Sequence, residues 1–387
     1  MRSMVVVLLA QQAALASQGG RAGPEIPISL DGDAVVVPLR IQGSSKVLRF
    51  VVDTGAEITI IDKRTAKALG LSPGSDIELE TVGGETTIPT VELKALQIGS
   101  YEATAVRAAS YDLSGLTTAM DSPVDGVLGI DVLSRFRFTI NYGRKTMFIS
   151  ATNTPSPVQG VRVPLTQGSG GYLVPVTLNG DSDVDLLLDT GTNMTQLPWN
   201  VWQSVIKTWQ PRKLLKGVIS SGQDAGHSYL ARLDSLQMGN LRIDSPVVRF
   251  VLPASTGTFA EPEAPGLLGS DVLRHFIVTI DIPRSQLFLA PASDFHEDPL
   301  EFSSIGIQFL KKDKQLFVVG VWEGSPADEL HIQRGDQILE IQATPVADLS
   351  GARIEQLLRG PKGTAVELKL RRGNRLAVLK VPRRELL

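Results

Sequence analysis

The sequence predicts a mainly β protein in which one unit is repeated and a different, smaller module follows. Three observations carry this prediction. The tripeptide Asp-Thr-Gly occurs twice, at 53–55 and 189–191, each time directly after an apolar run. Each copy is followed by further matching segments in the same order. Residues 301–387 match neither copy, so we expect them to form a separate module.

Four features of the repeat recur in order. Each Asp-Thr-Gly is followed by a Gly-containing hairpin, then by an apolar-apolar-Gly segment, then by an alternating pattern that turns on Gly or Pro. Four ordered matches indicate a duplicated β unit of about 140 residues. The matching stretches are LRFVVDTGAEITII (48–61) and DLLLDTGTNMTQL (185–197), GVLGIDVLSRF (126–136) and GLLGSDVLRHF (266–276), and FTINYGRKTMFI (138–149) and VTIDIPRSQLFL (278–289).

Two stretches rich in Pro, Ser or Thr, at 151–158 and 291–300, predict the domain boundaries. We therefore expect a first lobe over 17–150, a second over 158–292 and the C-terminal module over 300–387.

Each part of the chain also predicts one helix. Asp62 can cap a helix over 63–69, and Pro198 fits the first turn of a helix that continues through 202–206. In the C-terminal module, the pattern at 350–358 predicts a helix among short strands.

The composition limits the classes of function. The 387 residues are 42% hydrophobic and 20% charged, with 36 Gly and 23 Pro, which suits a loop-rich globular β protein. The net charge of −3 and the lack of a basic stripe argue against nucleic acid as a partner. The absence of Cys excludes disulfides, thiol catalysis and Cys-ligated zinc, and the four His residues have no metal-ligand spacing. We expect no metal and no cofactor.

The first sixteen residues have the pattern of a secretory signal. Arg2 is a minimal positive region, Met4–Ala10 is apolar, and Ala14-Leu15-Ala16 is a small-residue cleavage site. The alternatives are a disordered tail or a wrongly assigned start codon. The apolar run is too short to span a bilayer. We therefore expect an exported protein, periplasmic or secreted, without stable membrane insertion.

With the repeat established, residues 35–290 resemble the aspartic peptidases, both pepsin-like and retroviral-type. The resemblance implies a bilobal acid-protease-like β-barrel fold in which the two Asp-Thr-Gly turns meet face to face. Asp-Thr-Gly-Ala at 53–56 is similar to the retroviral-type motif, and Asp-Thr-Gly-Thr at 189–192 to the second motif of pepsins. We therefore expect unequal surroundings for the two carboxylates.

The chemistry of this resemblance rests on Asp53 and Asp189 as catalytic residues. Two carboxylates in contact cannot both ionise at low cost, so they share one proton across a useful pH range. Such a pair can act as base toward a water and as acid toward a carbonyl oxygen. Glycines allow tight turns beside the carboxylates, and the resemblance implies threonine hydroxyls that bond across the lobes. These supporting residues are Thr54, Gly55, Thr190 and Gly191.

The Gly-containing hairpins that follow each Asp-Thr-Gly are predicted to be flaps over a cleft. The first carries Gly83 and Gly84, and the second carries Gly222.

Residues 300–387 resemble a PDZ domain. Gly306-Ile307-Gln308-Phe309 stands where that family has its carboxylate-binding loop, and GSPA at 324–327 and GDQIL at 335–339 match two further segments. The resemblance implies capture of a carboxy-terminal peptide or a strand by backbone N–H groups and edge addition. The alternative is a docking module that only packs on the lobes.

The sequence therefore predicts an exported aspartic endopeptidase with a polypeptide substrate, which its PDZ domain recruits or whose access it regulates. The alternative is a catalytically inactive peptide-binding or scaffold protein that acts mainly through its PDZ domain. A serine peptidase is a rival because Gly-Ser-Gly-Gly at 168–171 is faintly similar to a trypsin-type nucleophile loop. The first His, His227, follows that Ser, which is the reverse of the order in that family.

Overall fold

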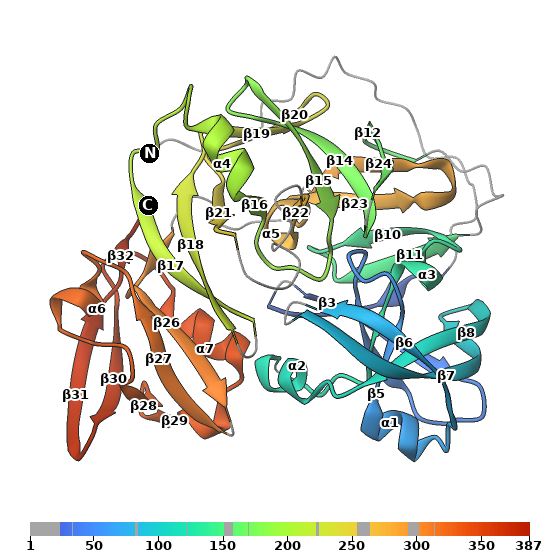
Figure 1. Ribbon diagram of the computed structural model, residues 1–387, viewed down its shortest axis with the longest axis horizontal. Helices are drawn as coiled ribbons and strands as arrows, with labels where there is room; N and C mark the ends of the chain where they lie inside the picture. Colours follow the sequence, from blue (N-terminus) through green and yellow to red (C-terminus); the bar gives the residue numbers. More distant parts are fainter. Residues whose placement is uncertain are drawn as a thin grey trace.

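A computed structural model describes ten segments of the chain, and they are mainly β-strands (Figure 1). The prediction of a mainly β fold is confirmed. The predicted signal sequence, Gly83 and Gly222 lie outside the described residues, and the predicted domain boundaries stay predictions because 151–157 and 293–301 lie outside them too. The described segments are 24–32, 34–81, 84–120, 122–150, 158–168, 170–221, 224–253, 264–292, 302–312 and 314–387.

The first lobe is an eight-stranded sheet in the order β2-β3-β4-β9-β5-β8-β7-β6. Its strands β4 and β9 run parallel, with Val52 opposite Leu128. The elements are β2 (Ser29–Asp31), β3 (Ala34–Ile41), β4 (Leu48–Val52), β5 (Ile60–Asp62), α1 (Lys63–Ala68), β6 (Pro73–Thr81), β7 (Gly84–Ile98), β8 (Tyr101–Tyr111), α2 (Ser114–Ala119), β9 (Gly126–Leu128) and α3 (Ile130–Leu133).

The second lobe repeats this arrangement. Its strands β15 and β22 form the corresponding parallel pair, with Leu188 opposite Leu268. The elements are β13 (Thr166–Gly168), β14 (Gly171–Leu178), β15 (Ser182–Leu188), β16 (Gln196–Pro198), α4 (Trp199–Val205), β17 (Leu214–Ser221), β18 (Asp224–Arg232), β19 (Ser235–Met238), β20 (Leu241–Asp244), β21 (Val247–Val251), β22 (Gly266–Leu268) and α5 (Ser270–Leu273).

A six-stranded sheet joins the lobes in the order β1-β11-β10-β23-β24-β12. At its centre Thr139 of the first lobe lies opposite Thr279 of the second, and their hydroxyls are 2.7 Å apart. The sequence predicts both hairpins but not their union, because alternation assigns faces and not partners for strand edges. The strands are β1 (Ile26–Pro27), β10 (Arg137–Asn141), β11 (Thr146–Ser150), β12 (Val161–Pro164), β23 (Phe276–Asp281) and β24 (Gln286–Pro291), with the turn η1 (Ile282–Arg284).

Both predicted helices of the lobes are present: α1 begins at Lys63 as predicted and ends one residue earlier, and α4 has a shifted start. Asp62 caps α1 by accepting from the backbone N–H groups of Arg64 and Thr65. The second helix, α4, begins at Trp199, with Pro198 at its N-cap position and not in its first turn. The short helices α2, α3 and α5 were not predicted, because each is brief and its N-cap residue makes no side-chain cap hydrogen bond.

The C-terminal module has its own core and a sheet in the order β26-β27-β28-β30-β31. The predicted helix is α7, and Ser350 caps it by accepting from the backbone N–H of Arg353. The elements are β25 (Ser303–Ser304), β26 (Ile307–Lys312), β27 (Gln315–Val321), α6 (Pro326–Glu329), β28 (Gln337–Ile341), β29 (Thr344–Pro345), η2 (Val346–Asp348), α7 (Gly351–Leu358), β30 (Ala365–Arg372), β31 (Arg375–Pro382) and β32 (Arg384–Glu385).

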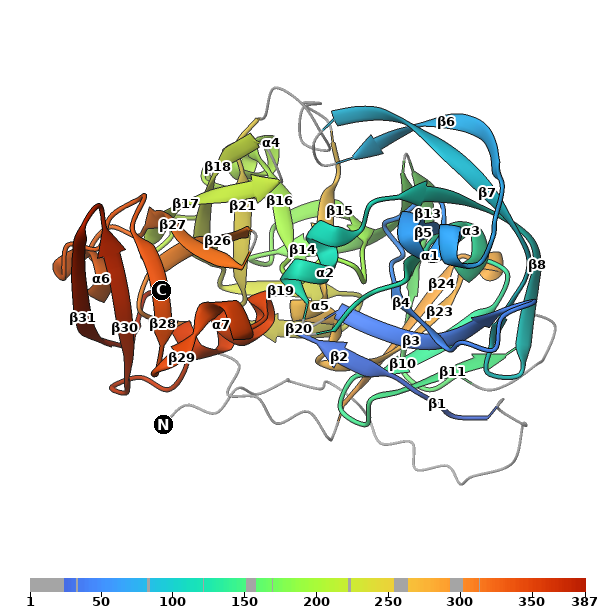
Figure 2. The same cartoon turned by 90° about the horizontal axis from the view of Figure 1, so that it is seen from below.

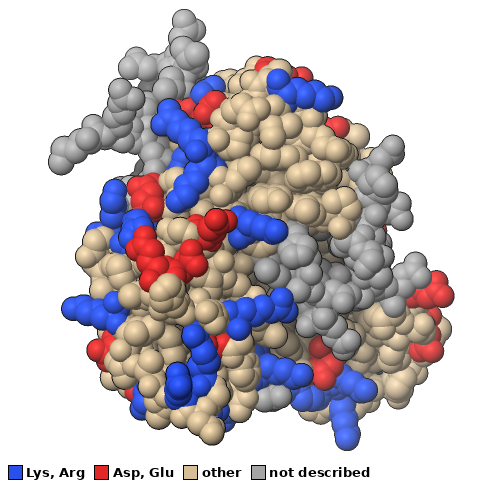
Figure 3. Space-filling model, turned by 60° about the vertical axis from the view of Figure 1, so that its left-hand side comes forward, with Lys and Arg blue, Asp and Glu red and all other residues tan. Residues whose placement is uncertain are grey.

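This module packs against the second lobe (Figures 1 and 2). Strand β17 contacts both β26 and β27. A buried cluster crosses the boundary and includes Leu215 and Leu230 of the lobe with Phe302 and Trp322 of the module. Arg232 donates to Glu385 Oε1 and to the backbone oxygen of Leu387, each at 3.3 Å. Over the described part of the face in Figure 3, basic and acidic side chains are interspersed.

Two turns approach each other closely at Gly129, which follows β9, and a substitution there tests this packing. A Cβ at this position would lie 2.6 Å from the carbonyl carbon of Ile58, which is backbone and cannot rotate away. We expect Gly129→Ala to lower the free energy of unfolding by about 1–3 kcal/mol in a urea titration. Gly115→Ala is the control, because a Cβ there meets nothing within 4 Å. Equal stability of the two variants would contradict the packing described.

Candidate functional site

The two Asp-Thr-Gly turns follow the ends of β4 and β15 and lie against each other. A Cβ on Gly55 would be 2.8 Å from Cγ of Asp189, and a Cβ on Gly191 would be 2.4 Å from Cγ of Asp53. Each glycine therefore leaves the space in which the carboxylate of the other lobe sits. Any larger residue at either position would push the two acids apart.

The carboxylates of Asp53 and Asp189 are hydrogen-bonded to each other. Burial raises the pKa of Asp53, although N–H groups of its own turn lower it, with Gly55 donating to Oδ1 at 2.9 Å. Burial and then the negative charge of Asp53 raise the pKa of Asp189 well above its ordinary value. Burial of both carboxyls, together with the charge of Asp53 acting on Asp189, therefore favours a proton shared between the two acids.

Four hydrogen bonds made by the buried hydroxyls of Thr54 and Thr190 hold the two turns together. The Thr54 hydroxyl donates to the backbone oxygen of Leu188 at 2.7 Å and accepts from the N–H of Thr190 at 3.1 Å. The Thr190 hydroxyl donates to the oxygen of Val52 at 2.8 Å and accepts from the N–H of Thr54 at 3.2 Å. These bonds link the lobes at the base of the acid pair and limit its relative movement.

Two further acids, Asp131 and Asp271, were not singled out from the sequence. Oδ1 of Asp131 accepts from the N–H and the hydroxyl of Thr59, both at 2.8 Å. Oδ1 of Asp271 accepts from the N–H of Thr195 at 2.9 Å and from its hydroxyl at 2.8 Å. Each bond set ties the loop after an Asp-Thr-Gly turn to the apolar-apolar-Gly turn of the same lobe. The signal was available, since both Asp and Thr recur at matching positions of the repeat.

The two halves of the site differ beside the acid turns. The Thr192 hydroxyl accepts from Gln196 Nε2 at 3.2 Å, whereas the equivalent Ala56 has no hydroxyl. The Ser270 hydroxyl donates to the backbone oxygen of Thr190 at 3.1 Å, and Ile130 at the matching position cannot do so. The second turn is thus held by more side-chain hydrogen bonds than the first.

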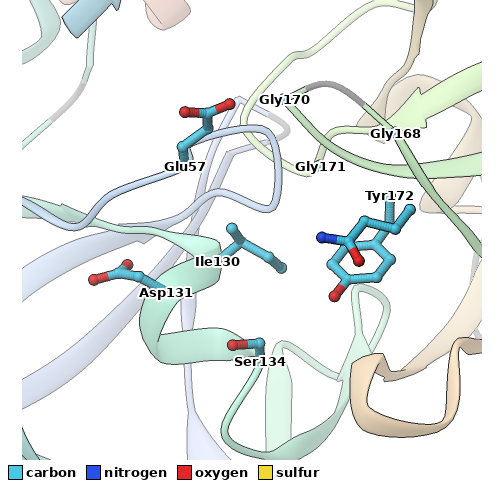
Figure 4. A pocket seen from close by; sticks show the side chains of 9 residues that line it. Glu57, Ile130, Asp131, Ser134, Gly168, Gly170, Gly171 and Tyr172 are labelled. Atoms are coloured by element: carbon cyan, nitrogen blue, oxygen red, sulfur yellow. The ribbon is translucent and has the colours of Figure 1, made fainter. Parts of the chain in front are cut away.

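A cavity of about 250 Å³ lies between the two lobes (Figure 4). Its lining comes from the first lobe after Ala56 and in α3, and from the second lobe around β13 and β14. Ile130 and Tyr172 reach into the space between the lobes, while the Asp131 carboxylate is turned away from Tyr172. The lining residues are Glu57, Ile130, Asp131, Ser134, Gln167, Gly168, Gly170, Gly171 and Tyr172.

Both predicted flaps fall on hairpins of the structure. Gly84 begins β7, which pairs with β6, and the second hairpin pairs β17 with β18. Gly83, Gly222 and the rival nucleophile Ser169 lie outside the described residues. The role of these hairpins as flaps stays a prediction.

The predicted carboxylate loop of the PDZ domain lies at the start of β26. Gly306 has φ of +88°, and its oxygen accepts from the N–H of Trp322 at 2.9 Å. Ile307 is buried in the core of the module, and Phe309 packs against that core. Gln308 lies against the second lobe, since a Cβ on Gly217 would be 3.2 Å from its Nε2. Ligand binding by these residues stays a prediction.

The aspartyl protease family matches residues 37–132 and 174–272, which together make up half of the chain. The chain belongs to this family. The PDZ domain family matches residues 303–382. The two matched aspartyl protease segments include both acid turns and both apolar-apolar-Gly segments.

The curated relatives are named differently. The chain is 26% identical over 184 residues to a probable CtpA-like serine protease of Staphylococcus haemolyticus, which covers 46% of this chain and 37% of the relative. It is 35% identical to tight junction protein ZO-3 of Canis lupus familiaris, over 33% of this chain and 14% of the relative. It is 37% identical to the carboxy-terminal processing protease CtpA of Bacillus subtilis, over 18% of this chain and 15% of the relative. The chain thus spans less than half the length of these relatives.

These relatives contradict one expectation from the sequence. The sequence led us to expect an aspartic-type endopeptidase that activates water between Asp53 and Asp189 and uses its PDZ domain to recruit substrate or regulate its access. The relatives that carry an enzyme name are serine proteases or carboxy-terminal processing proteases. We therefore correct that assignment: family membership places the chain among proteases with a PDZ domain and does not fix its reaction type.

The helices were also compared with the length and polarity needed to span a membrane. Within the segments that the structure describes, every helix is too short or too polar to cross a bilayer. The predicted signal sequence lies outside these segments, so export stays a prediction.

Proposed function

We propose that this chain is a protease that processes polypeptides close to their carboxy termini. The observation that carries the proposal is the packing of the PDZ strands β26 and β27 on the hairpin strand β17 of the second lobe. A carboxy terminus held at the start of β26 would place the preceding residues beside the protease lobes. The Bacillus subtilis relative is named as a carboxy-terminal processing protease, which supports the same substrate class.

As site residues we propose Asp53 and Asp189, with Thr54, Gly55, Thr190 and Gly191 as their support. The pair lies where the two lobes meet, and burial raises the pKa of both carboxyls. At the PDZ domain we propose Gly306 to Phe309 as the part that takes the peptide end. We also propose that the protein is exported, on the signal-like pattern of its first residues.

The test uses the full chain and a pool of random peptides with free carboxy termini, read by mass spectrometry. We expect cleavage near the terminus, weaker cleavage of the same pool with amidated ends, and a loss of at least ~1,000-fold in Asp53→Asn and in Asp189→Asn. The exposed Asp234→Asn is the matched control and should cleave normally.

Two results would overturn parts of this proposal. Equal cleavage of free and amidated pools would remove the carboxy-terminal preference. Retained cleavage in both Asp→Asn variants would remove Asp53 and Asp189 from the site, and inactivation of the wild type by diisopropyl fluorophosphate would assign the reacting group to a serine.

A further inference from the structure

The edge of β26 is where an added strand would pair, and the chain's own first lobe reaches that edge. In the described part of the chain, β26 pairs only with β27, so its other side can accept hydrogen bonds from an extended peptide. Helix α2 of the first lobe contacts β26 and also α7 of the PDZ domain. Figures 1 and 2 both draw α2 beside α7.

The contact between α2 and α7 is a close backbone approach. A Cβ on Gly351, the first residue of α7, would lie 2.6 Å from the backbone oxygen of Ala119, the last residue of α2. A second contact comes from the turn before β3, where a Cβ on Gly32 would be 4.0 Å from Cβ of Ala352. The first lobe thus meets the start of α7 at two points far apart in the sequence.

The end of α7 that meets α2 is opposite to the end near the predicted carboxylate loop. The backbone N–H of Ile305 donates to the oxygen of Leu358, which places the loop at the C-terminal end of α7. Gly351, at the N-terminal end, meets α2. A peptide whose terminus sits at Gly306 and that pairs antiparallel with β26 would therefore extend toward α2.

Helix α2 is weakly held in this position. It has six residues, none of them buried, and its N-cap residue Leu113 makes no side-chain cap hydrogen bond, although the N–H of Ser114 donates to Asp112 Oδ1 at 2.8 Å. Segments with few buried contacts open at a small cost in free energy. On its other side, Leu116 of α2 packs against a cluster that contains Val51, with Ala56 of the first acid turn also packed against it. A movement of α2 would therefore change the packing next to Asp53.

We infer that α2 acts as an intramolecular ligand of the PDZ domain. A polypeptide carboxy terminus has to displace α2 before it can pair along β26. This inference rests on the proposed capture of carboxy termini and adds the competition by α2. Occupied and unoccupied states of the β26 edge then differ in the packing beside the first acid turn.

Two variants of the full chain have opposite effects on the release of α2 from the PDZ domain. Gly351→Ala adds a methyl group that clashes with Ala119, at a position where φ is not in the left-handed region, so it should push α2 away. Ala119→Cys with Gly351→Cys carries the same added Cβ, but its disulfide, once oxidised, ties α2 to α7 covalently and prevents its release, and the chain has no other Cys. Gly115→Ala controls for the direction of the effect: its methyl group meets nothing within 4 Å and Ala favours a helix over Gly, so exchange in α2 should stay unchanged or slow down.

Hydrogen–deuterium exchange reads the position of α2 without a ligand. We expect faster exchange in 114–119 and along β26 in Gly351→Ala, slower exchange in the oxidised double-Cys variant, and rates like those of Gly351→Ala after its reduction. Binding is read by anisotropy with a fluorescein-labelled pool of random hexapeptides with free carboxylates. We expect roughly tenfold tighter binding to Gly351→Ala than to the oxidised variant.

The outcomes separate the two proposals. Unchanged exchange rates in both variants would overturn the role of α2, whatever the peptides do. Exchange that responds, with equal peptide binding to all forms, would overturn the competition but leave the capture of carboxy termini standing. Exchange that responds, with no binding even to Gly351→Ala, would overturn the capture itself and the competition with it.

Discussion

Replacing Thr54 by Val is expected to destabilise the two lobes against each other by about 2–6 kcal/mol, because it leaves two buried backbone groups without partners at about 1–3 kcal/mol each. Those groups are the oxygen of Leu188 and the N–H of Thr190, which the Thr54 hydroxyl now satisfies. Val has the same shape but no hydroxyl, so the loss is one of hydrogen bonds and not of volume. A urea titration of the full chain measures it, with the transition of the lobes followed by Trp fluorescence.

The matched control is Thr54→Ser, which keeps the hydroxyl and removes one methyl group. We expect it to lower the free energy of unfolding by about 1 kcal/mol. The equivalent change in the second lobe, Thr190→Val, should be as damaging as Thr54→Val, since it also removes two buried bonds. Similar stabilities for the Val and Ser variants would show that the four bonds between the turns do not hold the lobes.

Much of the site was predictable because the chain contains it twice. A strand, a turn and an apolar-apolar-Gly segment recur in order, and this is enough to expect Asp53 and Asp189 at one junction. The roles of Asp131 and Asp271 needed the fold. Each of these acids is separated in sequence from the Thr that it binds by the flap hairpin and several strands, so only the folded turns bring them together.

Other features depend on contacts between units, which periodicity does not report. The shared sheet forms because β10 and β23 present free edges to each other, although each hairpin alone looks complete in the sequence. The same holds for α2, whose six residues are too few to show an amphipathic pattern. Its contact with α7 joins segments some 230 residues apart, a separation as long as a large domain. Local patterns predicted the parts, and edge pairing and docking decided their arrangement.

The enclosed carboxylate of Asp271 leads to the second large effect, a stability that depends on pH. Its Oδ1 accepts three hydrogen bonds, from Thr195 twice and from the N–H of Val272, and these favour the charged form. Burial outweighs them and raises the pKa of Asp271 from 3.8 to about 6. In the unfolded chain the same carboxyl ionises at its ordinary pKa. Folding therefore favours the protonated form, and the stability that this proton provides is present below pH 3.8 and is lost as the pH rises through about 6.

We expect Asp271→Asn to be more stable than the wild type by about 2–3 kcal/mol at pH 7.5, since a shift of one pKa unit corresponds to about 1.4 kcal/mol. Asn keeps an oxygen for the N–H and hydroxyl of Thr195 and cannot ionise. The difference should shrink between pH 6 and pH 4 and vanish below it, which urea titrations at three pH values would measure. Asp131→Asn is the matched variant: burial raises the pKa of Asp131 too, but its carboxylate is less enclosed, so the gain should have the same sign and be smaller. A destabilised Asp271→Asn at pH 7.5 would mean that the charged form is the one that holds the loop after Thr195, and the sign of the pH dependence would then reverse.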